Sequence, residues 1–217
     1  MASYNVRDLK DDSAAAARVV RALSPDVLCL QEIPRYPLSG HRVASFADAC
    51  GMLFGGGHQG SGGTTVFTSL RMEVASSTHR RLPVGFLART RGYAVAQVAL
   101  PGCSPVLVVS AHLGLDAAER VRHVQAMLGR LQAPMPTIVG ADLNEPDGGP
   151  AWRSLTSLRP VTGPSPTFPA RAPRARIDAV FATADLRRVD GPPVLLVQAD
   201  LAAASDHLPV WVDLAVR

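Results

Sequence analysis

Short runs of Val, Leu, Ile and Ala recur along the chain and are separated by segments rich in Gly, Pro and charged residues. Runs of this length and composition are typical of half-buried or buried strands. They predict strands near residues 26–31, 64–69, 71–77, 93–99, 105–111, 137–141, 177–182, 194–198 and 208–214. Many neighbouring runs are close enough in sequence to pair as hairpins.

Three other segments have the spacing of amphipathic helices. Residues 12–24 predict a helix with Asp12 or Ser13 as its N-cap, and residues 42–50 predict a second one. Residues 116–132 predict the clearest helix, with Asp116 as its N-cap. Its apolar stripe consists of Val121, Val124, Leu128 and Leu131.

Two segments show neither the spacing of a helix nor the apolar run of a strand, and we predict loops there. Residues 55–63 read GGGHQGSGG, and residues 159–176 contain five prolines and four arginines. Predicted strands outnumber predicted helices, and helices fall between some of them. This order favours a mixed α/β sandwich in which helices cover packed sheets, built as one domain over residues 1–217.

The composition changes this picture only slightly. Aromatic residues make up 5% of the chain, so the core must consist mainly of Val, Leu and Ala. The three cysteines, Cys29, Cys50 and Cys103, have no zinc-site spacing and are odd in number, which favours a reduced, cytoplasmic protein. The charged start MASYNVRDLKDD resembles no export signal, and no apolar run is long enough to span a membrane.

The formal net charge of +4 suggests an anionic partner such as nucleic acid, a phosphate compound or a membrane surface. A coding bias explains the same charge equally well. Lys10 is the single lysine, and the other 21 basic residues are arginines in a chain rich in Ala, Gly and Pro.

Polar residues stand at the ends of several predicted strands. They are Asn5, Glu32, His112, Asp142, Asn144, Asp178, Asp206 and His207. Each alone is explained as a turn, cap or hydrogen-bonded residue. Together they supply mostly oxygen ligands, which is what Mg²⁺ and phosphate chemistry require. The sequence contains no G-x-S-x-G, H-E-x-x-H or G-x-x-x-x-G-K-[ST] motif that would indicate another chemistry.

Six motifs occur in an order that resembles the endonuclease/exonuclease/phosphatase superfamily. They are YNV, LQE, AHL with R-x-x-Q at Arg122–Gln125, GADLN, RIDAVF and SDHLPV, and they extend from Tyr4 to Val210. That superfamily includes deoxyribonucleases, abasic-site endonucleases, neutral sphingomyelinases and inositol-phosphate phosphatases. The resemblance implies a four-layer α/β sandwich, with two packed, mostly antiparallel sheets flanked by helices and the site at one sheet edge.

The resemblance also implies a metal site that holds Mg²⁺, with Mn²⁺ as a substitute. Glu32 resembles the main metal ligand of the family, and Asn5 stands beside it. Asp206 resembles the second acidic position near the metal.

The remaining residues resemble the groups that act on the phosphate. Asp142 would orient or deprotonate the attacking water, and Asn144 would hold a metal-side water and a phosphate oxygen. His207 would contact the scissile phosphate, and Asp178 would fix the tautomer of that histidine. His112 would either stabilise the developing charge or protonate the leaving oxygen.

The substrate stays open between three classes. The first is nucleic acid, favoured by arginines in two segments and by the aromatic residues Phe86, Tyr93 and Phe168 near them. The arginines are Arg80, Arg81, Arg89, Arg91, Arg171, Arg174 and Arg176. The alternative is a phosphatase or phosphodiesterase for a small molecule or lipid headgroup, and the third class is a catalytically silent binding protein. A monomer is expected, and Glu145 is predicted to face solvent or the rim of the site.

Overall fold

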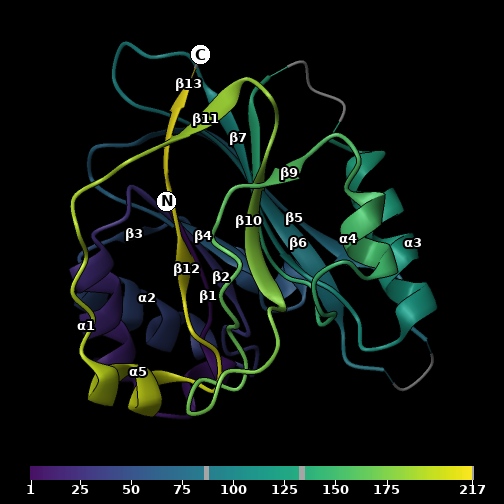
Figure 1. Cartoon of the computed structure of the whole chain (residues 1–217). Helices are drawn as coiled ribbons and strands as arrows, with labels where there is room; N and C mark the ends of the chain where they lie inside the picture. The colour runs from purple at the N-terminus through teal and green to yellow at the C-terminus, as the bar shows by residue number, and fades with distance from the viewer. Residues whose placement is uncertain (86–87, 132–134, 217) are drawn as a thin grey trace.

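Two sheets packed face to face form the centre of the molecule in a computed structural model that describes residues 1–85, 88–131 and 135–216 (Figure 1). In order across the first sheet, the strands are β12 (Val210–Trp211), β1 (Ala2–Asn5), β2 (Val27–Gln31), β4 (Thr65–Thr68) and β3 (Leu53–Phe54). Across the second sheet, they are β5 (Glu73–Leu82), β6 (Arg91–Ala99), β7 (Val106–His112), β8 (Thr137–Asp142), β10 (Asp178–Ala182) and β9 (Arg159–Pro160). A separate pair consists of β11 (Leu186–Val189) and β13 (Asp213–Val216).

The helices cover the outer faces of the two sheets, so the fold has the four layers that the sequence predicts. On the first sheet lie α1 (Ser13–Leu23), α2 (Ser39–Cys50) and α5 (Gln198–Ala204), and on the second lie α3 (Ala117–Leu128) and α4 (Pro150–Ser154) (Figure 1). Two 3₁₀ turns, η1 (Arg7–Leu9) and η2 (His58–Ser61), complete the assignment. The predicted caps are confirmed, since Asp12 accepts hydrogen bonds at the start of α1 and Asp116 does so at the start of α3.

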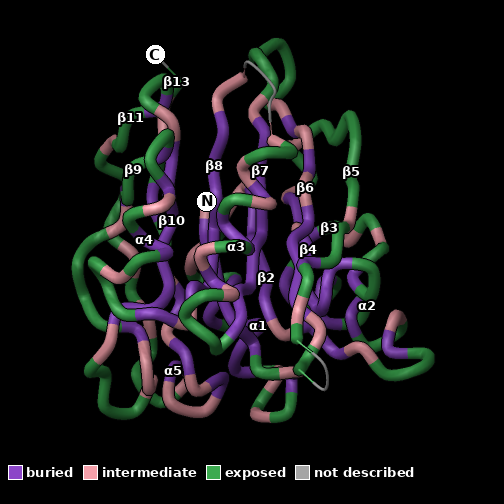
Figure 2. Tube along the Cα trace, turned by 90° about the vertical axis from the view of Figure 1, so that its right-hand side faces the viewer, coloured by how far each residue is buried: buried purple, intermediate pink, exposed green. Residues whose placement is uncertain are grey.

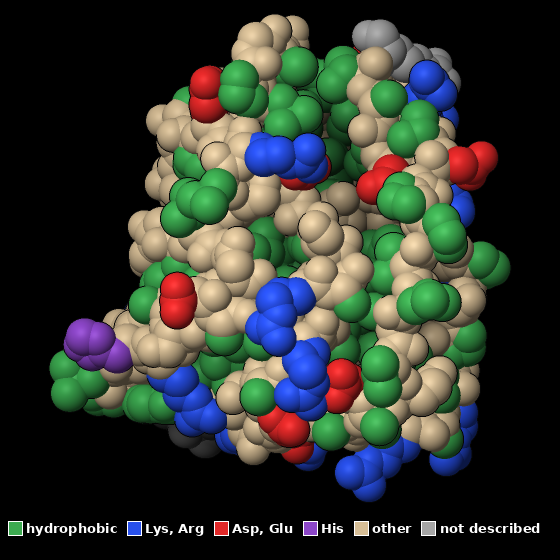
Figure 3. Space-filling model, turned by 90° about the vertical axis from the view of Figure 1, so that its left-hand side faces the viewer, with side chains coloured by type: hydrophobic (Ala, Val, Ile, Leu, Met, Phe, Trp, Pro, Cys, Tyr) green, Lys and Arg blue, Asp and Glu red, His purple; other side chains and the backbone are tan. Residues whose placement is uncertain are grey.

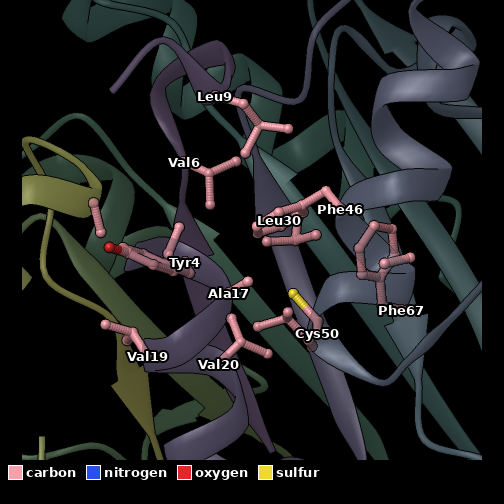
Figure 4. Close-up of a cluster of buried hydrophobic side chains, with 14 of the residues drawn as sticks. Tyr4, Val6, Leu9, Ala17, Val19, Val20, Leu30, Phe46, Cys50 and Phe67 are labelled. Carbon is pink, nitrogen blue, oxygen red and sulfur yellow. The ribbon is translucent and has the colours of Figure 1, made fainter. Parts of the chain in front are cut away.

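Apolar packing occurs in layers, and the buried residues are concentrated in the central strands (Figure 2). Figure 4 shows the layer between the first sheet and its helices, where Tyr4 and Leu30 meet Val20 of α1 and Phe46 of α2. Aliphatic and small residues fill most of this layer, as the low aromatic content predicts.

The two sheets approach each other closely at Gly140 of β8. A Cβ atom at this position would lie 2.8 Å from Cys29 Cβ and 3.0 Å from Ser3 Cβ, both on the opposite sheet. Beside it, the buried Gln31 amide donates to Ser3 Oγ and Ser110 Oγ, both at 3.1 Å. Only glycine fits this approach, and the polar bridge fixes how the sheets lie relative to each other.

Parallel and antiparallel pairing bring several strand ends to one edge. The β1–β2 and β7–β8 pairs are parallel, and the other pairs are antiparallel. In register, Asp142 lies opposite His112 on β7 and Asp178 on β10. The motifs that are far apart in sequence therefore meet at the end of β8.

Two predictions of local structure are wrong. The predicted strand at 194–198 is a coil leading into α5, because its apolar residue Leu195 is 89% exposed and the sequence QADLAAA favours a helix. The segment 159–176 is not simply a surface loop, because Thr167 and Arg176 in it are buried. Among the described residues, no helix combines the length and the apolar character that crossing a bilayer requires.

Candidate active site

Asp142, the last residue of β8, lies at the centre of the site and is 1% exposed. Its Oδ2 accepts a hydrogen bond from Asn5 Nδ2 at 2.8 Å, and its Oδ1 accepts one from the Asn144 backbone N–H at 2.9 Å. Asn5 belongs to the first sheet and Asp142 to the second, so this contact joins the two sheets. Asn144 has φ +49°, which asparagine tolerates better than most residues, and its amide donates to Leu113 O at 3.0 Å.

A histidine–carboxylate pair lies next to Asp142. His207 Nδ1 is 3.0 Å from Asp178 Oδ2, and the same oxygen accepts a 2.6 Å hydrogen bond from the hydroxyl of Thr167. The other ring nitrogen, Nε2, is 4.0 Å from Asp142 Oδ2. The Phe168 ring packs against the imidazole, with 4.9 Å between ring centroids. Asp178 therefore orients His207 with Nε2 turned towards the centre of the site.

His112 approaches Asp142 from β7. Its Nε2 lies 3.4 Å from Asp142 Oδ2 and 3.9 Å from Glu32 Oε1, and its Nδ1 lies 3.4 Å from a guanidinium nitrogen of Arg91. The Nε2 atom is buried and has no hydrogen-bond partner within the described residues.

Burial and neighbouring charges shift the pKa values of His112 and His207 in opposite directions. Burial lowers the pKa of His112 well below its ordinary value, and the Arg91 charge lowers it further. Burial acts in the same direction on His207, but the charges of Asp178 and Asp142 outweigh it and raise the pKa of His207 to about 9. Burial and the Asp178 charge raise the pKa of Asp142 to about 6. At neutral pH, His112 is thus uncharged and His207 is protonated.

The oxygen donors fit a divalent cation. A carboxylate oxygen of Asp142, a carboxylate oxygen of Asp178 and a ring nitrogen of His207 lie within 4.8 Å of one another. The Glu32 carboxylate, 22% exposed, accepts no hydrogen bond from the described residues and faces the same space. Several acids around a buried position repel one another, and a hard cation such as Mg²⁺ would relieve this repulsion.

The structure gives Asp206 a different partner from the other predicted residues. Its Oδ2 lies 3.2 Å from Arg7 Nε, and Arg7 also pairs with Asp11 at 3.2 Å. Asp206 does not belong to the group formed by Asp142, Asp178 and His207. Its role as a metal ligand stays a prediction.

Three contacts of the site are not predicted by the sequence. Thr167 comes from the proline-rich segment 159–176, and Arg91 stands at the start of an ordinary strand. Ser205 Oγ donates to Asn5 O at 2.7 Å and accepts from the His207 backbone N–H at 3.3 Å. Ser205 opens the SDHLPV motif, and the tertiary fold alone brings Thr167 and Arg91 to the other residues of the site.

Several residues expected on the surface are buried. Glu145, predicted at the solvent or the rim, is 3% exposed and pairs with Arg120 at 3.1 Å. Arg176 lies over the Trp152 ring and pairs with Asp147 at 2.7 Å. These internal pairs turn the charged groups of Glu145 and Arg176 towards the protein and away from a substrate.

The aromatic residues expected to stack on bases have different positions. Tyr93 is buried and is closed to a substrate, whereas Phe168 packs on His207 at the site itself. Phe86 lies outside the described residues.

The profile of the Endonuclease/Exonuclease/phosphatase family matches residues 2–207, which include every residue of the site described above. The chain belongs to this family. Family membership agrees with the motif order and with the two packed sheets. It supports hydrolysis of a phosphate ester and leaves the substrate undefined. Among curated proteins, none matches the chain.

Solved structures of family members have the same fold. An endonuclease/exonuclease/phosphatase from Bacteroides vulgatus superimposes with a TM-score of 0.79 at 16% identity, covering 100% of this chain and 98% of the other. A mannosyl-6-phosphatase from Bacteroides thetaiotaomicron gives 0.78 at 16% identity, covering 99% and 98%. D. rerio TDP2 in complex with a single-strand DNA product gives 0.78 at 18% identity, also covering 99% and 98%. At these identities the likeness establishes the fold alone.

Proposed function

We propose that this family member is a Mg²⁺-dependent phosphodiesterase that cleaves nucleic acid, with Mn²⁺ as a substitute for Mg²⁺. The observation that carries the proposal is the buried Asp142 carboxylate, which lies between the His207–Asp178 pair and the free Glu32 carboxylate. A carboxylate with a raised pKa, a protonated histidine and unpaired oxygen ligands are the groups that hydrolysis of a phosphate ester requires.

We assign Glu32 as the main ligand of the metal, and the family resemblance supports Asn5 and Asp206 as the further residues near it. A divalent cation held there supplies charge neutralisation to the phosphoryl oxygens. Asn5 has a second task, because its amide N–H groups hold Asp142 Oδ2 at 2.8 Å.

The water side consists of Asp142 and Asn144. Asp142 accepts a proton from the attacking water as that water approaches phosphorus in line with the leaving oxygen. The hydrogen bonds from Asn5 and Asn144 aim the carboxylate and limit its rotation. The side chain of Asn144 contacts a phosphate oxygen.

The histidine side stabilises the charge that develops on the phosphoryl group. His207 donates from Nε2, because Asp178 accepts the proton on Nδ1. His112, at the end of the neighbouring strand β7, faces the same space and contributes a second polar contact.

Exposed arginines support nucleic acid as the substrate, since they can bind consecutive phosphates. They are Arg80, Arg81, Arg89, Arg171 and Arg174. The similar TDP2 structure contains a single-strand DNA product, which is a relative's property and only supports the proposal.

The burial of Arg91, Arg176 and Tyr93 favours a second candidate, a phosphatase or phosphodiesterase for a small molecule or lipid headgroup. These residues were expected to contact nucleic acid, and their burial leaves a smaller surface for it. On the face that carries α1 and α5, basic side chains are interspersed with acidic ones (Figure 3). The mannosyl-6-phosphatase shows that the fold serves a sugar phosphatase.

One experiment separates the two candidates. Purified protein is incubated with Mg²⁺ or Mn²⁺ and with plasmid DNA, abasic duplex, RNA, inositol phosphates, sphingomyelin and a sugar phosphate. Cleavage of a nucleic acid supports the first candidate, and turnover of only a small phosphate or lipid supports the second. Turnover of none, in a protein that is folded by circular dichroism, contradicts both.

We further propose a monomeric, single-domain protein in the cytoplasm. Its three cysteines form no disulfide, which fits a reducing compartment.

A further inference from the structure

The two ring nitrogens of His112 have opposite surroundings. Nδ1 faces the Arg91 guanidinium at 3.4 Å, within hydrogen-bond geometry. Nε2 faces Asp142 Oδ2 at 3.4 Å and Glu32 Oε1 at 3.9 Å, yet it is buried and makes no hydrogen bond within the described residues. A buried polar atom without a partner, aimed at a reaction centre, indicates that its partner is a ligand.

The chemistry of arginine decides which nitrogen of the ring carries the proton. A guanidinium group has only N–H donors and no acceptor. The Nδ1 atom therefore accepts from Arg91, and the proton of the neutral ring lies on Nε2.

The backbone around Arg91 leaves this arginine little freedom. Gly92 pairs directly with His112 across β6 and β7, which sets Arg91 beside the imidazole. Gly62 packs so closely that a Cβ atom there would lie 2.7 Å from the carbonyl carbon of Arg91. On the other side, Arg35 donates to Thr90 O at 3.1 Å. The glycine-rich segment thus helps to hold Arg91 against His112.

Arg91 is also an unusual arginine. It is 5% exposed and forms no ion pair within the described part of the chain, and burial lowers its pKa although the charges of Asp142 and Glu32 act in the opposite direction. A buried guanidinium without a carboxylate partner is costly, so a structural role alone gives no reason for it.

We propose that Arg91 is a positioning residue that keeps His112 in the Nε2–H tautomer, so that His112 acts as an uncharged hydrogen-bond donor to a phosphoryl oxygen. This inference rests on the proposed phosphoester hydrolysis. It assigns different tasks to the two histidines, because the charged His207 can give up a proton to the leaving oxygen and His112 only donates a hydrogen bond.

The tautomer is measured by NMR, without a substrate. Long-range ¹⁵N–¹H spectra distinguish a protonated from an unprotonated ring nitrogen, and the His112 signals are identified by their loss in His112→Gln. We expect the wild type to have unprotonated Nδ1 and protonated Nε2. In Arg91→Met the proton should redistribute between the nitrogens, whereas Arg91→Lys should retain the wild-type pattern. The control is Arg89→Met, which removes a neighbouring charge and should leave the tautomer unchanged.

Activity then separates hydrogen bonding from proton transfer. Gln can place an amide N–H near the position of Nε2 but cannot transfer a proton. His112→Gln should therefore retain at least about 10-fold more activity than His112→Ala, since removing one such donor costs on the order of 10²-fold or more. Arg91→Met should lose no further activity when combined with His112→Ala, because it acts through that ring.

Three results would overturn the inference. They are a proton on His112 Nδ1 in the wild type, equal loss of activity in His112→Gln and His112→Ala, and multiplied losses in the Arg91→Met/His112→Ala double variant. An Arg91→Met variant that keeps the wild-type tautomer would also refute the role of Arg91. If no phosphate ester is turned over but the wild type has the Nε2–H tautomer and Arg91→Met loses it, the proposed function fails and the assignment of Arg91 to the tautomer stands.

Discussion

Asp142 and Glu145 lie close together at the end of β8, and both carboxylates are buried, at 1% and 3% exposure. Their surroundings differ. Glu145 Oε1 accepts from Arg120 at 3.1 and 3.2 Å, and its Oε2 accepts from the Ala151 N–H at 2.6 Å. Asp142 has neutral hydrogen-bond donors, and its charged neighbours include a second acid, Asp178.

This difference shows that burial alone does not tell a structural carboxylate from one that is suited to catalysis. A buried carboxylate with a cationic partner and satisfied oxygens is part of the scaffold. A buried carboxylate beside another acid gains free energy when it binds a proton or a metal, so it is suited to catalysis. The Glu145 pair joins the loop after β8 to α3 and α4, and this loop carries Asn144. Each prediction below tests one side of this comparison.

Removal of the metal should have the largest effect on turnover. It should act through the carboxylates around Asp142 and leave the Arg120–Glu145 pair unchanged. We expect EDTA to abolish turnover and excess Mg²⁺ or Mn²⁺ to restore it, because the carboxylates at the centre of the site need a cation. Mg²⁺ should also raise the melting temperature of the wild type and of Glu145→Gln alike. Full activity in EDTA would contradict the proposed mechanism.

Replacement of Asp142, the general base of the proposed mechanism, should come next. Asp142→Asn removes the basic group at almost unchanged volume, and kcat should fall by at least about 10²-fold. Stability should hold or rise, because the repulsion from Asp178 disappears. Steady-state kinetics and thermal melting measure the two quantities, and an active Asp142→Asn protein would refute the role of Asp142.

Asp178→Asn should have a smaller effect and a characteristic pH dependence. We expect kcat to fall roughly 10-fold or more, because His207 loses the acceptor that orients it. The Asp178 charge favours protonated His207, so its removal lowers the pKa of His207. The alkaline limb of the pH–rate profile should therefore move to lower pH, and an unchanged limb would show that His207 titrates independently of Asp178.

Glu145→Gln should have the smallest effect on activity and a clear effect on stability. The buried Arg120 guanidinium loses its partner, so the free energy of unfolding should fall by about 2 kcal/mol. At temperatures where the variant is folded, kcat should stay within a few-fold of the wild type. Urea unfolding provides the measurement.

The double variant Glu145→Gln/Arg120→Met is the control for this last change. Removing both charges should recover part of the lost stability, because no buried charge is then left alone. Full stability together with lost activity in Glu145→Gln would reverse the assignment of the two carboxylates.

The sequence predicts the parts of this structure that depend on local pattern. Helix caps at Asp12 and Asp116 follow from residue type, and the position of Asp142 follows from the end of an apolar strand. The burial of Glu145 depends on Arg120, which lies in a helix that precedes β8. The residue before Pro146 therefore looks like an ordinary loop residue in the sequence.

The same limit applies to Thr167 and to the segment 194–198. The hydroxyl of Thr167 reaches Asp178 because the proline-rich segment folds back over the sheet, which no periodicity indicates. The segment 194–198 has the composition of a strand, but its Leu195 is 89% exposed and Gln198 already begins α5.

The close approach at Gly140 has a consequence for how this protein loses activity. The Asn5–Asp142 contact joins the two sheets, and Gly140, two residues before Asp142, sets the distance between them. Any agent that lets the sheets slide past each other would misalign the reacting groups while each sheet keeps its own hydrogen bonds. Heat or pressure should therefore abolish activity before secondary structure is lost. A fall in activity would then report a shift of one sheet against the other.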